Sequence, residues 1–363
     1  MKPFIPAKLP LSELNWSLFI PSLSIVNREI ARYDGLLQSL PNPGLLLSPL
    51  ITQEAVLSSK IEGTQATLED VLKFEAQPEK QIRHADDIHE IINYRKALNT
   101  AVDELKKRPI SLNLLKKTHQ ILLSGVRGKN KMTGQFRKVQ NWIGKPGSPI
   151  ENARYIPPSP ETIGELLDNL EKYIHYDEKD RLVQLAIIHA QFEIIHPFLD
   201  GNGRIGRILI PLFLYEKKIL NNPMFYLSSY FENHREEYYN KLLSITEANK
   251  WEEWILFFLK AIQYQSQQNS EKAKKILNLY SEMKEKVAEI THSQFIMQVI
   301  DSLFKSPIFS SSFFRQKSRI PRASAIRILN QLKNNNIISI LEEPKGKKPA
   351  VYIFDKLIEI VEE

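Results

Sequence analysis

HPFLDGNGRIGR, which runs from His196 to Arg207, is the stretch that decides both the fold and the chemistry of this chain. It holds an imidazole, a carboxylate, three glycines, an asparagine and two arginines in twelve residues. The apolar segment before it, residues 186–195, predicts a helix that ends at His196, and a second helix is predicted from Ile205 to Lys218. A packed core does not require this combination of residues, whereas a site for a polyphosphate with its metal ion and a general base does.

The glycine-rich turn 201–203, which we call the phosphate nest, favours the binding of phosphate groups. Its glycines free the backbone to point successive N–H groups at one anion, and the dipole of the helix that follows adds to the attraction. Arg204 and Arg207 are neighbours on one helix face, and a guanidinium can hold phosphate oxygens with paired hydrogen bonds. Asp200 can hold a Mg²⁺ ion that bridges the phosphates. His196 would lie close enough to take a proton from an attacking hydroxyl.

A zinc site made of His189, Glu193 and His196 is an alternative use of these side chains. In the HExxH pattern the two histidines are four residues apart, whereas His189 and His196 are seven apart. Seven residues span about two helical turns, so the two rings would stand too far apart to share one zinc ion. We therefore reject this metal site.

The stretch resembles, without a departure, the signature of Fic-domain proteins, a family that transfers AMP from ATP to protein hydroxyl groups. The similarity extends to HAQFEIIHPFLDGNGRIGR, to GQFRKVQNWIG…YIPPSP and to YLSSYFENHREEYYNKLL, and so covers residues 85–262. The resemblance implies a mainly α fold, in which a helical Fic core carries a β-hairpin flap. Two strand-like runs, residues 136–143 and 153–156, are where we expect that hairpin.

The resemblance also implies a role for each matching residue. His196 would activate a Ser, Thr or Tyr hydroxyl of the target protein, Asp200 would hold Mg²⁺, and the flap would dock the target by strand addition. Of two adjacent tyrosines similar to residues that line the nucleotide pocket, Tyr238 and Tyr239, we favour Tyr239. The residues assigned to ATP are Glu62, His196, Gly201, Asn202, Gly203, Arg204, Ile205, Gly206, Arg207 and Tyr239, and those of the flap are Gln140, Asn141, Trp142 and Ile143.

The segment from Ser58 to Gly63 has the form S-x-x-x-E-G and resembles the inhibitory helix motif of the same family. The resemblance implies that Glu62 forms a salt bridge with Arg207, which then cannot take the γ-phosphate of ATP. This is physically reasonable because a carboxylate and a phosphate compete for the same guanidinium. The sequence therefore predicts an enzyme that is held inactive by its own N-terminal region.

The C-terminal region has the pattern of a winged helix-turn-helix, which some Fic proteins of this architecture carry. Helices are predicted at Gln294–Phe304, Ser311–Gln316 and Arg322–Asn334, followed by a hairpin made of IISILEE, PKGKKP and AVYIFD. On the third helix we expect Ile326, Leu329 and Leu332 to face the core. The residues expected to face a partner are Arg322, Ser324, Ala325, Arg327 and Asn330, with Lys345, Lys347 and Lys348 at the wing tip. Duplex DNA and a protein partner remain open as what this face binds.

These assignments divide the chain into an N-terminal helical region with the inhibitory motif (1–85), a Fic catalytic core (86–262), a linker helix (263–291) and a winged-helix domain (292–363). The net charge is +7, and from residue 306 onward ten Lys and Arg face six Asp and Glu. This concentration of positive charge permits nucleic-acid contact without requiring it.

The composition predicts a cytoplasmic protein. The chain has no cysteines, which excludes disulfides and thiolate metal sites. It also has no run of eighteen apolar residues, so we expect no membrane-spanning helix. The start of the chain lacks the pattern of a signal peptide. We expect a protein adenylyltransferase that uses ATP and Mg²⁺ and can also modify itself. The alternatives are a nucleotide-sensing DNA-binding regulator and removal of AMP by the same site, and a homodimer is also left open.

Overall fold

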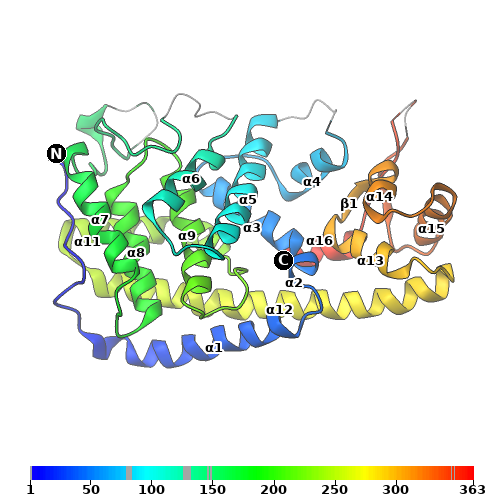
Figure 1. Ribbon diagram of the computed structural model, residues 1–363, viewed down its shortest axis with the longest axis horizontal. Coiled ribbons are helices and arrows are strands. Elements are labelled where there is room, and N and C mark those ends of the chain that lie inside the picture. The colour runs from blue at the N-terminus through cyan, green and yellow to red at the C-terminus, as the bar shows by residue number, and fades with distance from the viewer. Residues whose placement is uncertain are drawn as a thin grey trace. The chain divides into compact units, whose positions relative to one another are not determined.

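The computed structural model describes residues 2–78, 84–125, 132–144, 147, 149–344, 346 and 348–363. Helices dominate this part of the chain, so the prediction of a mainly α fold is confirmed (Figure 1). The first half contains η1 (Trp16–Leu18), α1 (Ile20–Ser39), α2 (Pro43–Leu46), α3 (Ser48–Ile61), α4 (Leu68–Ala76), α5 (Ala85–Leu105), α6 (Leu112–Leu122), η2 (Ile150–Asn152), η3 (Pro160–Thr162) and α7 (Ile163–Ile174). The second half contains α8 (Arg181–Ile195), α9 (Asn202–Glu216), α10 (Ser228–Asn233), α11 (Arg235–Ala248), α12 (Trp251–Thr291), α13 (Ile296–Lys305), β1 (Ile308–Ser310), α14 (Ser311–Ser318), α15 (Arg322–Asn334), β2 (Ser339–Glu342), β3 (Val351–Ile353) and α16 (Asp355–Glu362).

The chain folds into two compact units that are interleaved along the sequence. The first unit comprises residues 1–34, 57–63 and 93–267, and the second comprises 35–56, 64–92 and 268–363. The end of α3 therefore belongs to the first unit, although the chain on both sides of it belongs to the second. The predicted linker helix, 263–291, is part of the single continuous helix α12.

Helix α8 is the centre of the first unit. Its sequence is apolar on nearly every side, and a helix of this kind is stable only where other elements surround it. It packs between α7 and α9 and also contacts α11 (Figure 1). Asp180 caps its N-terminus by accepting hydrogen bonds from the backbone N–H groups of Leu182 and Val183. Near its middle, the Trp254 indole donates to the carbonyl of Ala186 over 2.8 Å. These contacts fix the helix whose last residue precedes His196.

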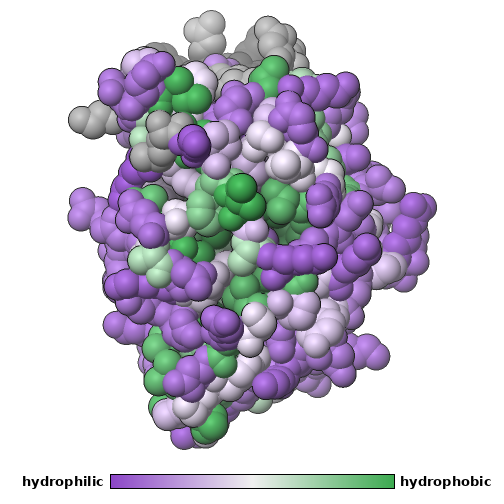
Figure 2. Space-filling model, turned by 90° about the vertical axis from the view of Figure 1, so that its left-hand side faces the viewer, coloured by the Kyte–Doolittle hydropathy of each residue, from purple (hydrophilic) through white to green (hydrophobic). Residues whose placement is uncertain are grey.

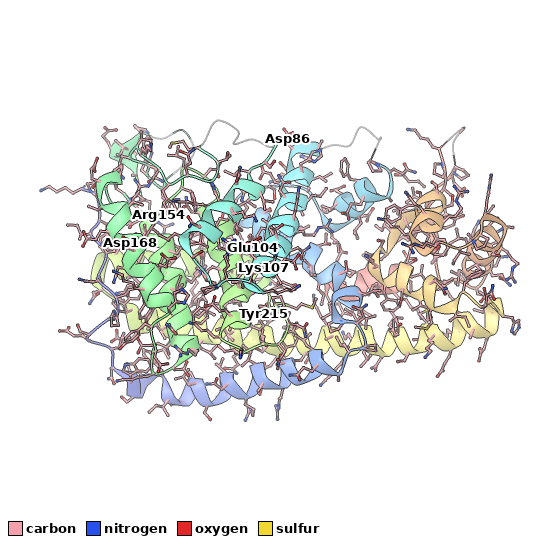
Figure 3. The ribbon with its side chains drawn as sticks, in the orientation of Figure 1. Asp86, Glu104, Lys107, Arg154, Asp168 and Tyr215 are labelled. Carbon is pink, nitrogen blue, oxygen red and sulfur yellow. The ribbon has the colours of Figure 1, made fainter. Side chains whose placement is uncertain are left out.

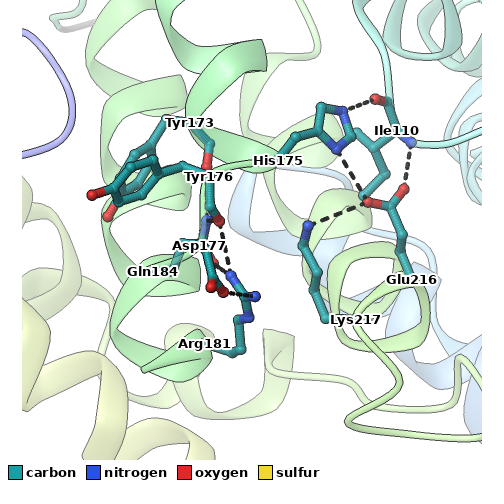
Figure 4. Close-up of polar contacts among 9 residues, drawn as sticks. All are labelled: Ile110, Tyr173, His175, Tyr176, Asp177, Arg181, Gln184, Glu216 and Lys217. Carbon is teal, nitrogen blue, oxygen red and sulfur yellow. Dashed lines mark hydrogen bonds and ion pairs between the residues drawn. The ribbon is translucent and has the colours of Figure 1, made fainter. Parts of the chain in front are cut away.

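A polar network ties the far ends of α7 and α9 together (Figure 4). A ring nitrogen of His175 lies 2.8 Å from the carbonyl oxygen of Ile110, and the other lies 3.6 Å from the Glu216 carboxylate. Glu216 also accepts a hydrogen bond from the Ile110 N–H and lies 3.7 Å from the Lys217 ammonium. The network therefore fixes the C-terminal end of α9, the helix whose N-terminal end belongs to the HPFLDGNGRIGR stretch, against the end of α7.

The predicted flap hairpin is much smaller in the structure than in the prediction. Instead of strands over 136–143 and 153–156, the described residues form one antiparallel bridge, between Ile143 and Tyr155. The reason is that nearby donors bind elsewhere: the Arg137 N–H donates to the Pro197 carbonyl, and the Gln140 side chain donates to the Pro157 carbonyl. These bonds place the flap segment against the end of α8 and leave no regular ladder.

The C-terminal part of the second unit contains a three-stranded antiparallel sheet in the order β1-β3-β2. Ile308 pairs with Ile353, and Ser339 pairs with the same residue from the other side. The predicted hairpin is thus present as β2 and β3, while β1 and α16 were not predicted. The order helix, strand, two helices and hairpin is the one that a winged helix-turn-helix requires, and this assignment stays a prediction.

Two residues of α15 face the other way from what the sequence predicts. Ile326 is 49% exposed, whereas Ala325 is 2% exposed and packs inside. Arg327 donates to the Thr291 carbonyl, so it is engaged within the second unit. Lys345 and Lys347 of the predicted wing tip lie outside the described residues.

The surface carries hydrophobic as well as charged side chains. Figure 2 shows one face on which hydrophobic residues gather among hydrophilic ones. None of the helices in the described part of the chain is long and apolar enough to cross a membrane.

Candidate active site

The turn between α8 and α9 presents His196 and the phosphate nest at one place. His196 ends α8 in the left-handed conformation, with φ 49°, and Gly201 has φ 78° directly before α9. Helix α9 begins at Asn202, not at Ile205 as predicted, because the Gly201 turn already starts it. The Asn202 side chain accepts from the Phe198 N–H and donates to the Phe198 carbonyl, each over 2.8 Å. Asn202 therefore shapes the loop through its side chain.

His196 is held in the orientation that a general base needs. Its Nδ1 lies 3.3 Å from the carbonyl oxygen of Glu193, so this nitrogen carries the proton and Nε2 keeps its lone pair. Desolvation lowers the pKa of the ring to about 4, and the nearby Arg137 acts in the same direction. The Glu193 carbonyl, Glu62 and Asp200 oppose this shift without overcoming it. The ring is therefore neutral at neutral pH and able to accept a proton.

The first turn of α9 brings the nest together with two charged side chains. Asp200 and Arg204 lie on either side of it, with 3.5 Å between the Asp200 Oδ1 and Arg204 Nη2 atoms. Arg204 is almost fully buried, while 31% of the Asp200 side chain is exposed. Free backbone N–H groups at a helix start, a guanidinium and an accessible carboxylate form a surface suited to a polyphosphate and its cation.

The salt bridge predicted between Glu62 and Arg207 is present. Arg207 Nη2 lies 2.6 Å from Glu62 Oε1, and Arg207 also donates through Nε to the Ser58 hydroxyl and through Nη2 to the Ser58 carbonyl, each over 2.8 Å. Arg207 is 2% exposed, whereas 34% of the Glu62 side chain is accessible. Burial disfavours the charge on both groups, but each is the partner of the other, so the pKa of Glu62 is lowered and that of Arg207 is raised. Gly63 follows with φ 103°, a left-handed conformation that suits the glycine after a helix end.

The structure separates the two tyrosines of α11. Tyr238 is buried, and its hydroxyl lies 3.0 Å from His189 Nε2, while His189 Nδ1 lies 3.1 Å from the Gly206 carbonyl. Both ring nitrogens of His189 are thus used within the core, and the residue links α8, α9 and α11. Tyr239 is only partly buried, and desolvation together with Glu62 raises its pKa to about 12. Of the two tyrosines, Tyr239 is therefore the one that is partly exposed, and it lies near the Glu62–Arg207 pair.

Two of the four flap residues are hydrogen-bonded to neighbouring segments, and the other two are exposed to solvent. Gln140 donates to the Pro157 carbonyl, and Asn141 donates to the Phe198 carbonyl over 3.1 Å, which connects the flap to the HPFLDGNGRIGR loop. Trp142 and Ile143, at 43% and 36% exposure, present apolar side chains to solvent. The predicted flap set is therefore brought to the site, with its inner pair as anchors and its outer pair available for contact.

Two residues that sequence reasoning missed support the loop. Arg137 is 2% exposed and donates to the carbonyls of His196, Val139, Pro158 and Ile195, so one guanidinium joins the end of α8 to the flap. The negative C-terminal end of the α8 dipole also stabilises the positive charge of Arg137.

His119 acts in the same way from α6. Its Nδ1 accepts from the Gly134 N–H over 2.8 Å, so its Nε2 carries the proton and donates to the Asp200 carbonyl over 2.9 Å. The ring stacks on Phe198 at a centroid distance of 3.8 Å, and burial lowers its pKa to about 4. His119 stands in no quoted motif, and Arg137 lies in the GQFRKVQNWIG segment without being singled out there, so both look like ordinary polar residues in the sequence.

Comparisons with protein families give a consistent result. The N-terminal model of the Fic/DOC family matches residues 20–103, and the main model of the same family matches residues 109–214. Together the two matches cover more than half of the chain.

Curated relatives and solved structures agree with these matches. A protein of Aquifex aeolicus named as a probable protein adenylyltransferase is 24% identical over 309 residues, which is 84% of this chain and 86% of that protein. A protein adenylyltransferase of Caenorhabditis elegans is 26% identical over 140 residues, 38% of this chain, and this region spans only 25% of the relative. A Fic family protein from Desulfovibrio desulfuricans, at 18% identity, has a TM-score of 0.59 over 97% of this chain and 98% of its own. At this identity the structural likeness shows the fold, and it confirms the predicted Fic fold.

Replacing Arg137 with alanine should lower the free energy of unfolding by about 3 kcal/mol, because the carbonyls of two segments lose a charged donor. The measurement is equilibrium unfolding of the full chain in urea. The matched control is Arg154→Ala, since Arg154, labelled in Figure 3, is exposed on the same flap and its guanidinium donates to the side chain of Asn240. Equal stability of the two variants would contradict the bridging role of Arg137.

Proposed function

The chain belongs to the Fic/DOC family, and we propose that it is a protein adenylyltransferase. It would transfer AMP from ATP to the hydroxyl of a Ser, Thr or Tyr side chain of a target protein, its own chain included. The observation that carries this proposal is the neutral ring of His196, held with Nε2 free directly before a glycine-rich helix start. A nucleotide sensor would need the phosphate contacts but no base, so the orientation of His196 favours transfer.

Each group of residues would have its own role in the reaction. The N–H groups of the nest and the Arg204 guanidinium bind the phosphates, and the exposed flap residues hold the target segment beside them. His196 Nε2 takes the proton of the hydroxyl as its oxygen forms a bond to the α-phosphorus. The bond between the α-phosphorus and the bridging oxygen breaks, and pyrophosphate leaves. Positioning and charge stabilisation carry most of such a phosphoryl-type transfer.

Mg²⁺ is the cation expected with ATP, and the residues present fit it. Asp200 supplies one accessible carboxylate beside the nest, and in the described residues no group of three or more His, Cys, Asp or Glu is placed to hold a metal ion alone. Mg²⁺ usually binds through one or two carboxylates together with substrate phosphates and water, so a single carboxylate is sufficient. Bound there, the ion would neutralise phosphate charge.

We further propose that Glu62 inhibits the reaction. Its Oε1 atom lies 2.6 Å from Arg207 Nη2, and the hydroxyl and carbonyl oxygens of Ser58 accept two more hydrogen bonds from the same guanidinium. Arg207 is then unable to receive the γ-phosphate, so ATP would bind without the orientation that transfer requires. Displacement of the segment 58–63 would free the guanidinium.

Replacing Glu62 with glycine should raise incorporation of AMP by at least about tenfold, because the Arg207 guanidinium becomes available to the γ-phosphate. A tenfold increase corresponds to an activation free energy lower by about 1.4 kcal/mol. The measurement is intact-mass spectrometry of the full chain after incubation with ATP and Mg²⁺, with autoradiography for other targets. Glu62→Gln, which keeps the shape and loses the charge, should give an intermediate increase. Incorporation that stays at the wild-type level in both variants would contradict the inhibitory role.

Replacing His196 with alanine in the Glu62→Gly protein should reduce transfer by at least about a hundredfold, because the general base is lost. Binding of ATP, measured by calorimetry, should change by no more than about twofold, since the nest and the arginines remain. The matched control is His292→Ala, because His292 is exposed just beyond α12. Transfer that persists in the His196 variant would exclude this residue as the base.

A further inference from the structure

Two glycines on one face of α9 each lie against a carboxylate oxygen. A Cβ atom added at Gly203 would stand 2.2 Å from Glu62 Oε1, and one added at Gly206 would stand 2.2 Å from Glu193 Oε1. Glu62 comes from the end of α3 and Glu193 from the last turn of α8. Helix α9 thus admits two carboxyl groups, about one turn apart, at the two glycines that precede Arg207.

The two carboxyl groups differ in their partners. Glu62 Oε1 is hydrogen-bonded to Arg207, whereas the Oε1 atom of Glu193 is buried and has no hydrogen-bond partner among the residues that the structure describes. A buried carboxyl oxygen without a donor is costly when ionised, so such a group is expected to keep its proton.

The charges around Glu193 explain why it stays neutral in this state. It faces Arg207 of α9, Glu62 of α3, and Tyr238 and Tyr239 of α11. Burial raises the pKa of Glu193 to about 8, the carboxylate of Glu62 acts in the same direction, and Arg207 opposes both. With Glu62 on Arg207, a second negative charge beside the same guanidinium is disfavoured.

Removal of the segment 58–63 would change this balance. Arg207 would lose its bonds to the Ser58 hydroxyl, the Ser58 carbonyl and Glu62, while its guanidinium lies deep in the first unit. A buried cation that loses its partner strongly favours ionisation of a neighbouring acid. Helix α8 holds Glu193 against Gly206, the residue directly before Arg207, and α8 is not part of the segment.

We propose that Glu193 is a positioning residue that replaces Glu62 as the counter-ion of Arg207. It is neutral while Glu62 or the γ-phosphate of ATP occupies the guanidinium, and it is ionised while neither does. Arg207 would thereby stay in place in the released, empty site. The inference rests on the proposed function, and it has one direct consequence: when the γ-phosphate arrives, Glu193 takes up a proton from the solvent.

Calorimetry of nucleotide binding tests this consequence without any turnover. The full-length Glu62→Gly protein is titrated with Mg²⁺ and α,β-methylene-ATP, which keeps the γ-phosphate and cannot release its AMP part. Repeating the titration in buffers of different ionisation enthalpy gives the number of protons taken up. We expect the Glu62→Gly protein to take up as much as about one proton more than the Glu62→Gly/Glu193→Gln protein. The matched control, Glu165→Gln on the exposed face of α7, should leave the uptake unchanged.

A second measurement needs no substitution at Glu193. Because binding takes up a proton, the affinity of the Glu62→Gly protein should fall as the pH rises above the pKa of Glu193 in the empty site, by at most about tenfold per pH unit. Equal proton uptake with and without the Glu193→Gln substitution, or an affinity that does not fall with pH, would overturn the inference while leaving the transferase proposal intact. Absence of any binding to the Glu62→Gly protein would overturn the proposed function and the inference with it.

Discussion

The ion pair between Glu62 and Arg207 is the interaction on which the rest of the site depends. Arg207 is 2% exposed, and a guanidinium at that depth requires acceptors for its hydrogen bonds and a negative charge nearby. Glu62 and Ser58 supply both in this structure. Gly203 makes the approach of Glu62 feasible, because any larger residue would place its Cβ atom on the carboxylate oxygen. This partner reaches the site from a separate segment, which is the basis of the proposed control at Arg207.

The first unit holds the groups around this pair rigidly. Helix α8 is buried along its length and delivers His196 at its end, where Arg137 binds the carbonyls of both Ile195 and His196. Two further hydrogen bonds fix the loop that follows: His119 donates to the Asp200 carbonyl, and the Asn202 side chain accepts from the Phe198 N–H. His196 and the nest are therefore preformed while Glu62 is bonded to Arg207. Under the proposed inhibition, displacement of the segment 58–63 would change the partners of Arg207 without rebuilding the rest of the site.

The short motif was enough to predict the centre of the site, because its residues are adjacent in the sequence and their geometry is local. His196, Asp200, the nest and the two arginines lie where the motif placed them, and the predicted partner of Arg207 is in contact with it. Arg137 and His119 were missed because they act on backbone groups 59 and 81 residues away, which no local pattern reveals. The role proposed for Glu193 depends on the packing of α8 against α9. The flap strands were overestimated because the Arg137 N–H donates to the Pro197 carbonyl, outside the predicted hairpin.

The most direct test of this account is a crystal structure of the full chain with Mg²⁺ and α,β-methylene-ATP, determined for the wild type and for the Glu62→Gly variant. We expect Arg207 to remain bonded to Glu62 in the wild type and to contact the γ-phosphate in the variant, with His196 Nε2 facing the α-phosphorus. A γ-phosphate bound to Arg207 in the wild type while Glu62 is still in place, or one that avoids Arg207 in the variant, would contradict the claim that Glu62 and nucleotide compete for this arginine.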